Sequence, residues 1–391
     1  MFQRKLRVTT DESFFLFGAR GTGKSTWLTQ NFNQEECLWL DLLDPEIEDR
    51  YMKTPKALEN EIILLQKKNC TPSWVIVDEV QKIPRLLDVI HRLIENQKVR
   101  FVLTGSSARK LKRGHANLLG GRAALFTLYP LTQFEIGDRF DLDSALNWGT
   151  LPRIHIAPSP LERIRRLRSY CQIYLKEEVL VEQLIRNLPP FKGFLEILAQ
   201  MNGKLLNYES IGRDIGVDNK TVQSYIAILE ETFLGTRLPP FHTSIRKSQK
   251  QAPKFYWFDG GVARYLAGGI RSPLIPQTSA YSEAFEAWLV NEIIRHSSYH
   301  ELDYQFYYLQ TRNELEIDLI LSRGKELIAI EIKSSVRINP VEVLKLEGLA
   351  SDLPHKKRIY YLSKDPSRQQ VGEVVCLPWV DIFAELLSFE R

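Results

Sequence analysis

The segment Gly18–Ser25 constrains this chain more than any other, because it reads Gly-Ala-Arg-Gly-Thr-Gly-Lys-Ser. This run fits the P-loop pattern GxxxxGK[ST]. The apolar run Phe14–Phe17 precedes it and predicts a buried strand, and a helix-compatible run begins at Lys24. A loop between a strand and a helix can turn backbone N–H groups around a phosphate, and the helix N-terminus adds positive potential. We therefore expect this segment to bind a nucleoside triphosphate.

The P-loop pattern also predicts what individual residues do. Lys24 is expected to reach the β- and γ-phosphates, and Ser25 to present its hydroxyl to Mg²⁺. ATP and Mg²⁺ are therefore the expected cofactors. Contacts with the nucleotide are expected along the whole run: Gly18, Ala19, Arg20, Gly21, Thr22, Gly23, Lys24, Ser25 and Thr26.

A second apolar run, Trp74–Val77, ends in two acids, Asp78 and Glu79. This is the form of a Walker B strand, in which the first acid holds Mg²⁺ and the second polarises the attacking water. Two adjacent acids favour hydrolysis as well as binding. Farther along, Val99–Thr104 reads as another buried strand, and either Thr104 or Ser106 could sense the γ-phosphate. The sequence does not choose between these two hydroxyls.

Length and composition describe the broad class of the protein. The 391 residues suggest about two to four domains. A content of 44% hydrophobic and 26% charged residues is typical of a globular protein, and no apolar run approaches the length of a membrane span. The four cysteines, Cys37, Cys70, Cys171 and Cys376, lie far apart and form no zinc-binding pair. We expect a cytoplasmic protein without a membrane segment.

The net charge is only +4, but the basic residues are concentrated. No acid occurs between Asn96 and Phe134 or between Thr232 and Phe258, and both stretches are rich in lysine and arginine. The second stretch contains Arg237, Arg246, Lys247, Lys250 and Lys254. Such runs can be solvated faces, or they can contact nucleic acid. In a predicted NTPase they favour DNA as a partner.

The first 150 residues alternate between strand-like and helix-like runs, which favours a parallel sheet with helices on both faces. The expected strands are Phe14–Phe17, Cys37–Leu42, Trp74–Asp78, Val99–Thr104 and Ala124–Leu128, and the expected helices include Lys56–Lys68 and Arg85–Asn96. Arg122 precedes the last of these strands. It could act as an arginine finger on a neighbouring subunit of a homo-oligomer, or it could be structural.

The middle of the chain carries a helix-turn-helix pattern. Asn207 is expected to cap a helix that runs to Ile215, Gly216 to make the turn, and Asp218 or Asn219 to open a second helix. The apolar residues of the second helix fall on one face, which leaves Asn219, Lys220, Gln223 and Ser224 exposed. The basic stretch Arg246–Lys254 could then form a wing between two strands. Such modules bind DNA in the major groove or contact proteins.

The last third carries a second group of chemically useful residues. Leu315–Leu321 and Leu327–Lys333 predict two paired strands around the turn Arg323–Lys325. Glu331 and Lys333 are two residues apart, so they share a face, and Asp318 on the partner strand can meet them. Two carboxylates with an adjacent ammonium suit a divalent metal and phosphodiester hydrolysis. Glu286 lies in an otherwise apolar helical run, Tyr281–Arg295, and is a further candidate metal ligand.

Several phrases together resemble bacterial and archaeal AAA-type ATPases that carry a winged helix and a PD-(D/E)XK restriction-endonuclease-like C-terminal region. They are GARGTGKST, VIVDEVQKIP (Val75–Pro84), LTGSSARKL (Leu103–Leu111), GGR through Arg122, FTLYPLTQFE (Phe126–Glu135) and NELEID…IEIKSS. The resemblance implies that Lys24, Ser25, Asp78 and Glu79 serve the ATPase. It places Glu286, Asp318, Glu331 and Lys333 at the nuclease positions. The Pro-Asp pair of the family pattern is replaced here by Ile317-Asp318.

We therefore predict an α/β protein in four parts. A P-loop ATPase core occupies 1–130, a helical lid and linker 131–190, a winged helix-turn-helix 191–270, and a nuclease-like α/β domain 278–391. Three functions remain open: a DNA-directed ATPase with an active Mg²⁺-dependent nuclease, a DNA-binding ATPase whose nuclease-like part only grips DNA, and an ATP-switched scaffold. Metal ligands are expected at Ser25, Asp78, Glu286, Asp318 and Glu331.

Overall fold

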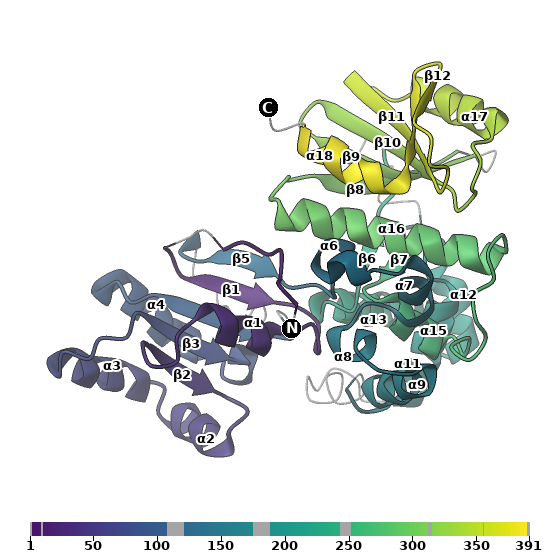
Figure 1. Cartoon of the computed structure of the whole chain (residues 1–391). Helices are drawn as coiled ribbons and strands as arrows, with labels where there is room; N and C mark the ends of the chain where they lie inside the picture. The colour runs from purple at the N-terminus through teal and green to yellow at the C-terminus, as the bar shows by residue number, and fades with distance from the viewer. Residues whose placement is uncertain are drawn as a thin grey trace. The chain divides into compact units, whose positions relative to one another are not determined.

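The computed structural model describes residues 2–8, 11–107, 121–174, 188–242, 252–311, 315–354 and 356–388. These residues form two compact units, drawn with the whole chain in Figure 1. The first unit contains the chain up to Leu131 together with Ala227–Leu234. The second contains the described chain from Thr132 onward, apart from that segment. The division into four parts stays a prediction.

The first unit is built on a five-stranded sheet in the order β2-β3-β4-β1-β5, and all its neighbouring strands are parallel. The strands are β1 (Phe14–Phe17), β2 (Cys37–Asp41), β3 (Trp74–Asp78), β4 (Phe101–Gly105) and β5 (Ala124–Thr127). The helices are α1 (Lys24–Asn31), α2 (Pro45–Lys53), α3 (Ala57–Lys67), η1 (Val80–Lys82) and α4 (Leu86–Gln97). The predicted parallel sheet is confirmed, with strand ends within two residues of those expected.

The order of these strands explains why the P-loop strand is so apolar. Strand β1 pairs with β4 on one side and β5 on the other, so it lies inside the sheet. All four of its residues are buried. On one face Phe15 and Phe17 join the core that β3 and α4 supply. A buried parallel strand needs apolar residues on both faces, which accounts for the unbroken run.

The second unit begins with short helices. They are α6 (Gln133–Ile136), η3 (Gly137–Arg139), α7 (Leu142–Trp148), α8 (Pro152–His155), α9 (Pro160–Ser169), η4 (Tyr170–Tyr174), α11 (Leu188–Gln200), α12 (Tyr208–Ile215) and α13 (Asn219–Glu231), whose last turns belong to the first unit. Part of the predicted helical lid and linker, residues 175–187, lies outside the described residues.

The predicted helix-turn-helix has the expected ends. Asn207 accepts a hydrogen bond from the Ser210 N–H at 3.0 Å and caps α12. Gly216 ends this helix in the left-handed conformation at φ +71°. Asp218 accepts from the Thr221 N–H at 2.6 Å, at the start of α13. Short polar side chains at these positions satisfy the free N–H groups of a first helical turn.

An antiparallel strand pair follows the two helices. It joins β6 (Gly235–Leu238) to β7 (Lys254–Trp257). The predicted wing residues Arg246, Lys247 and Lys250 lie outside the described residues. After β7 come α15 (Gly260–Leu266) and the long helix α16 (Ser279–Tyr299). The winged helix stays a prediction.

The rest of the second unit is a mixed six-stranded sheet in the order β12-β13-β11-β10-β9-β8. Its elements are β8 (Gln305–Gln310), β9 (Glu316–Arg323), β10 (Glu326–Ile332), α17 (Pro340–Ser351), β11 (Lys356–Ser363), β12 (Gln369–Val371), β13 (Val374–Pro378), η5 (Trp379–Asp381) and α18 (Ile382–Leu387). Figure 1 shows α16 running alongside this sheet. The hairpin β9–β10 turns at Gly324, whose φ of +60° favours glycine.

Two separate apolar cores cover the two faces of this sheet. Ile328 and Ile330 of β10 belong to the core that contains the apolar residues of α16. Leu327 and Ala329 belong to the other core, with residues of α17. Because side chains alternate along a strand, the side chain of Glu331 lies on the same face as Leu327 and Ala329, which is the face that α17 covers. Within the described ranges, no helix has both the length and the apolar character that crossing a membrane requires.

Candidate functional site

The P-loop connects β1 to α1 and needs glycine for two different reasons. At Gly18 a Cβ atom would lie 2.3 Å from the carbonyl oxygen of Leu128, which is far inside contact distance. At Gly23 the backbone has φ +100°, a conformation that other residues rarely adopt. The loop therefore runs against the end of β5 and then turns directly into the helix. This is the geometry that directs backbone N–H groups at a phosphate.

Lys24 and Ser25 lie at the first turn of α1, as predicted. Lys24 is buried, and its Nζ donates to the carbonyl oxygens of Gly18 at 2.8 Å and Ala19 at 3.3 Å. The ammonium group therefore lies within the loop that would surround a phosphate. Arg20 and Thr26 lie on the same loop and helix and are partly or fully exposed.

Arg4 supports this loop, and sequence reasoning missed it. Its guanidinium donates to the carbonyl oxygen of Thr22 at 2.6 Å and to that of Tyr129 at 2.5 Å. Tyr129 lies just beyond β5, so Arg4 links the P-loop to the edge of the sheet. Nothing local in the sequence marks this role, because both acceptors are backbone atoms far along the chain.

The Mg²⁺ ligands predicted for the ATPase lie together. The Ser25 hydroxyl donates to Asp78 Oδ2 at 3.0 Å, although they are 53 residues apart in sequence. Thr104 donates to the other oxygen of Asp78, and its hydroxyl also accepts from the Glu79 N–H at 3.4 Å. A hydroxyl beside a carboxylate at the strand ends fits the oxygen ligands that Mg²⁺ prefers. Ser25 and Asp78 would hold this ion beside the phosphates.

The predicted catalytic acid Glu79 is held in an unusual backbone conformation. Its φ is +59°, in the left-handed region that costs energy for a residue with a side chain. Gln81 donates from Nε2 to Glu79 Oε2 and, at 3.3 Å, to the Ser106 hydroxyl. Gln81 is buried and was not assigned a role from sequence. The two candidate sensors thus differ: Thr104 contacts Asp78, whereas Ser106 is connected to Glu79.

Arg122 contacts a helix of the first unit. Its guanidinium forms an ion pair with Glu95 of α4 at 2.5 Å, and both side chains are about two-fifths exposed. The arginine-finger role and the homo-oligomer that it requires stay predictions. Residues 108–120, which precede Arg122, lie outside the described residues.

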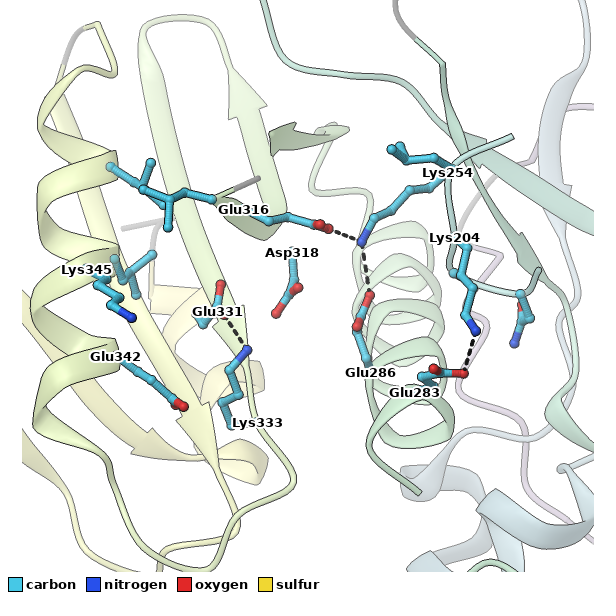
Figure 2. A pocket seen from close by; sticks show the side chains of 16 residues that line it. Lys204, Lys254, Glu283, Glu286, Glu316, Asp318, Glu331, Lys333, Glu342 and Lys345 are labelled. Carbon is cyan, nitrogen blue, oxygen red and sulfur yellow. Dashed lines mark hydrogen bonds and ion pairs between the residues drawn. The ribbon is translucent and has the colours of Figure 1, made fainter. Parts of the chain in front are cut away.

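The second site is a pocket of about 540 Å³ in the second unit, shown in Figure 2. The four residues that the sequence grouped as a nuclease-like set, Glu286, Asp318, Glu331 and Lys333, all line it. They come from α16, β9 and β10 with the residue that follows it. The structure therefore brings together every member of this predicted set.

Asp318 and Glu331 are held in different ways. Asp318 is buried, and its Oδ2 accepts from the Ile332 N–H at 2.7 Å. Glu331 Oε1 is paired with Lys333, whereas its buried Oε2 meets no hydrogen-bond donor among the described residues. Burial and then the charge of Asp318 raise the pKa of Glu331 to about 8, against the opposing effect of Lys333. An unpartnered buried carboxylate oxygen is a suitable ligand for a cation.

Glu286 reaches the pocket from α16. Its Oε1 accepts a hydrogen bond from the Tyr256 hydroxyl at 2.9 Å and lies 3.3 Å from Lys254 Nζ. Burial and then the nearby charge of Asp318 raise the pKa of Glu286 to about 7, although Lys254 and Tyr256 act in the opposite direction. This acid is therefore part of one electrostatically connected group.

The position of Lys254 differs from the predicted one. The sequence placed it in the basic stretch of a DNA-facing wing, but its side chain enters the pocket and the residue is only 4% exposed. It forms ion pairs with Glu286 and Glu316. Lys254 is the first residue of β7, a strand whose four residues are all buried. A lysine inside this pocket neutralises acids and cannot add to an exposed basic surface.

Acidic side chains outnumber lysines in the lining of the pocket. The lining contains six carboxylates and four lysines: Glu283, Glu286, Glu316, Asp318, Glu331 and Glu342 against Lys204, Lys254, Lys333 and Lys345. Because the pKa values of Glu331 and Glu286 are raised to about 8 and about 7, protons neutralise part of this acid set near neutral pH. No three His, Cys, Asp or Glu side chains of the described chain are grouped as a metal site. Lysines form ion pairs with Glu331, Glu286 and Glu316.

Sequence reasoning missed Glu316, Lys254 and Tyr256 as members of this pocket. A signal existed for Glu316, because it is two residues before Asp318 and therefore projects from the same side of β9. For Lys254 and Tyr256 no signal existed, since their strand precedes the predicted nuclease-like domain.

Comparison with family models divides the chain into three matched segments. Residues 10–137 match the model of an AAA domain. Residues 139–272 and 281–380 match two models described only as domains of unknown function, DUF8612 and DUF4143. The match at 10–137, together with the parallel sheet and the P-loop, supports an AAA-type ATPase domain in the first unit. Such a domain implies nucleotide binding.

Relatives of this chain occur in several bacteria. Uncharacterized proteins of Mycobacterium bovis and Mycobacterium tuberculosis are each 24% identical over 263 residues, which cover 66% of this chain and 58% of each relative. The aligned part thus spans less than two thirds of these mycobacterial proteins. An uncharacterized protein of Haemophilus influenzae is 21% identical over 357 residues and is covered to 85%, as is this chain.

Two solved structures were also matched. The Aeropyrum pernix ORC1 protein in complex with DNA has a TM-score of 0.25 and 13% identity, covering 67% of this chain and 87% of that one. A Vibrio cholerae protein has a TM-score of 0.21 and 12% identity, covering 97% of both chains. Scores this low carry no argument about fold or function.

Proposed function

We propose that this protein is an ATP-hydrolysing, DNA-directed enzyme whose second unit cuts phosphodiester bonds with the help of Mg²⁺. The observation that carries the proposal is the convergence of Asp318, Glu331, Lys333 and Glu286 on one pocket. Carboxylates hold a divalent cation, and a neighbouring ammonium can offset the charge that develops on a phosphate. The AAA domain of the first unit supports the ATPase half.

Within this proposal the residues of the pocket have different tasks. Asp318 and Glu331 would hold the cation, which supplies Lewis-acid assistance when bound. Lys333 forms an ion pair with Glu331, so it is placed beside the cation ligands. Glu286 would be an additional ligand from α16. In the first unit, Lys24 would contact the phosphates and Glu79 would polarise water.

DNA is proposed as the substrate because of the middle segment. The helices α12 and α13 and the strand pair β6–β7 follow one another as in a winged helix. The side chains of Gln223 and Ser224 on α13 are exposed, as direct reading of a groove requires. In such a complex the helix would contact the bases, and basic residues would contact the phosphates.

The experiment is a cleavage assay on linear and circular DNA, with and without Mg²⁺, in the presence of ATP, ADP or no nucleotide. We expect cleavage only with Mg²⁺ or Mn²⁺, and little with Ca²⁺, which tolerates looser geometry. DNA binding without cutting in every state would contradict the nuclease half of the proposal.

A second candidate function is favoured by one observation. Glu286, Glu316 and Glu331 are already paired with lysines, so the described acids form no ready-made metal site. A pocket in this state could serve an ATP-switched DNA-binding or scaffold protein that does not cut. The same assay separates the two functions, because a protein that only binds DNA would bind it with or without the divalent cation and would not cleave it.

A further inference from the structure

The pocket of about 540 Å³ in the second unit, here the acid pocket, is lined by four lysines. Among these four, Lys254 is the one that comes from the strand pair β6–β7. Its Nζ lies 3.3 Å from Glu286 Oε1 and is also paired with Glu316, as Figure 2 shows. The two acids belong to α16 and β9, so a single ammonium group connects three elements. No other ion pair of Lys254 is present within the described residues.

The backbone of Lys254 is fixed from two sides. It pairs with Leu238 in the neighbouring strand β6 and with Leu205 through an isolated bridge. The next contact along the chain, from the Leu206 N–H to the Pro253 carbonyl at 2.9 Å, strengthens this attachment. Any change in what Lys254 binds must therefore come from its four-carbon side chain and not from movement of the strand.

The ammonium group of Lys254 is buried between two acids. It is paired with Glu286 and with Glu316, so it already occupies the electrostatic position that a cation would take. It shares Glu286 with the proposed metal site. Two cations on one carboxylate group repel each other strongly at these separations.

We propose that Lys254 is an internal cation that competes with a divalent metal ion for the acid pocket, so that metal binds only when this side chain leaves Glu286 and Glu316. The inference rests on the proposed function, because it concerns the same carboxylates. Lys254 would regulate metal binding from outside the predicted nuclease-like domain, 278–391. Because linkage is reciprocal, metal should release Lys254, and a tightly held Lys254 should weaken metal binding.

The first test measures the affinity of the full-length protein for Mn²⁺ without nucleotide, by electron paramagnetic resonance of the free ion. We expect Lys254→Met to bind Mn²⁺ at least about tenfold more tightly than the wild type, because a nearby positive charge is removed. Lys254→Arg, which keeps the charge, should stay within about threefold. Equal or weaker binding by a folded Lys254→Met variant would overturn the proposal.

Lys204→Met is the matched control. It removes the same charge from the same pocket, but Lys204 is half-exposed and pairs with the half-exposed Glu283 at 3.0 Å. Solvent screens such a pair, so Mn²⁺ affinity should change by less than about threefold. A tenfold gain in this variant as well would mean that total charge, and not Lys254, controls the cation.

The second test needs no variant of Lys254 and therefore does not depend on its folding. Lysines of the wild-type protein are acetylated with a soluble ester and the rates are read by mass spectrometry. With saturating Mn²⁺, Lys254 should react at least about threefold faster relative to Lys204. The displaced side chain becomes accessible, and its deprotonated amine attacks the ester and expels the alcohol part of the reagent. An unchanged ratio while Mn²⁺ is bound would overturn the proposal.

Glu331→Gln separates this inference from the function on which it rests. Mn²⁺ binding that is lost in Glu331→Gln locates the ion in the pocket. If binding depends on Glu331 but Lys254→Met does not tighten it, only the competition fails. If neither the wild type nor Lys254→Met binds Mn²⁺, the metal-dependent function and the inference both fail.

Discussion

The P-loop and the acid pocket both concentrate charge, but they are assembled differently. The P-loop takes eight consecutive residues between one strand and one helix, and much of its chemistry is carried by the backbone. The acid pocket takes side chains from α16, β9, β10, α17 and the strand β7. Its properties depend on which charged side chains face one another.

This difference determines how each site can be disturbed. In the P-loop, Lys24 and Asp78 contact groups of the loop itself or of neighbouring strand ends. In the pocket, four acids are paired with lysines, so changing one side chain changes the charge of its neighbours. We therefore expect additive effects between the two sites and coupled effects within the pocket.

The largest expected effect tests the independence of the two sites. Asp318→Asn and Lys333→Ala should each reduce DNA cleavage by about 10³-fold, because they remove a metal ligand or the neighbouring ammonium. ATP hydrolysis should stay within about twofold of the wild type. Cleavage gels and phosphate release measure the two activities. Asp352→Asn, at an exposed position after α17, is the control. A parallel loss of ATPase activity would contradict the separation of the sites.

The next effect concerns the first unit alone. Glu79→Gln should keep ATP affinity but reduce steady-state hydrolysis by about 10²- to 10³-fold, because an amide cannot polarise the attacking water. Lys24→Ala should instead weaken ATP binding, since it removes the charge within the loop. Nucleotide titration and phosphate release distinguish the two. Full turnover by Glu79→Gln would move the catalytic base to another residue.

A pH experiment sharpens the comparison at the level of stability. Burial and then the charge of His300 lower the pKa of His296, in the second unit, to about 4. The folded protein therefore keeps His296 neutral, while the unfolded chain takes up a proton near pH 6.5. Stability is lost as pH falls from about 6.5 to about 4, by up to about 3 kcal/mol.

The variant His296→Gln should flatten this dependence. Denaturant unfolding at a series of pH values measures the difference in unfolding free energy between the variant and the wild type. The transition of the second unit should shift, whereas that of the first unit should not. An identical pH dependence in both proteins would mean that His296 titrates alike in the folded and unfolded states.

The smallest expected effect tests a residue that the sequence did not mark. Gln81→Leu removes the side-chain contacts to Glu79 and Ser106, so the catalytic acid loses its support. We expect kcat for ATP hydrolysis to fall about tenfold with little change in KM. Gln30→Leu, on the exposed face of α1, is the control. An unchanged kcat would leave Gln81 with a structural role only.

Much of the fold could be predicted from local patterns. The strand runs Phe14–Phe17 and Trp74–Asp78 match the structure residue for residue, because buried strands need unbroken apolar runs. The caps at Asn207 and Gly216 were also predictable, since each satisfies a local backbone requirement. The alternation of a strand placed Glu331 and Lys333 on one side, and the pocket confirms it.

The partners of these side chains could not be predicted in the same way. Arg4 binds backbone oxygens near residue 129, and Gln81 contacts a hydroxyl on another strand. Neither contact leaves a periodic signal. The basic residue Lys254 was assigned to an exposed wing because its neighbours in sequence are basic, yet the structure buries it among acids.

The sequence by itself determined the P-loop, the parallel sheet that carries it and the set of acids near the C-terminus. It could do so because those features follow from consecutive residues and from the period of a strand or helix. Only the tertiary structure decided that Lys254 faces Glu286, 32 residues away, and that it neutralises part of the acid set. The physical reason is that the strength of an ion pair depends on distance and burial, and packing between distant segments determines both.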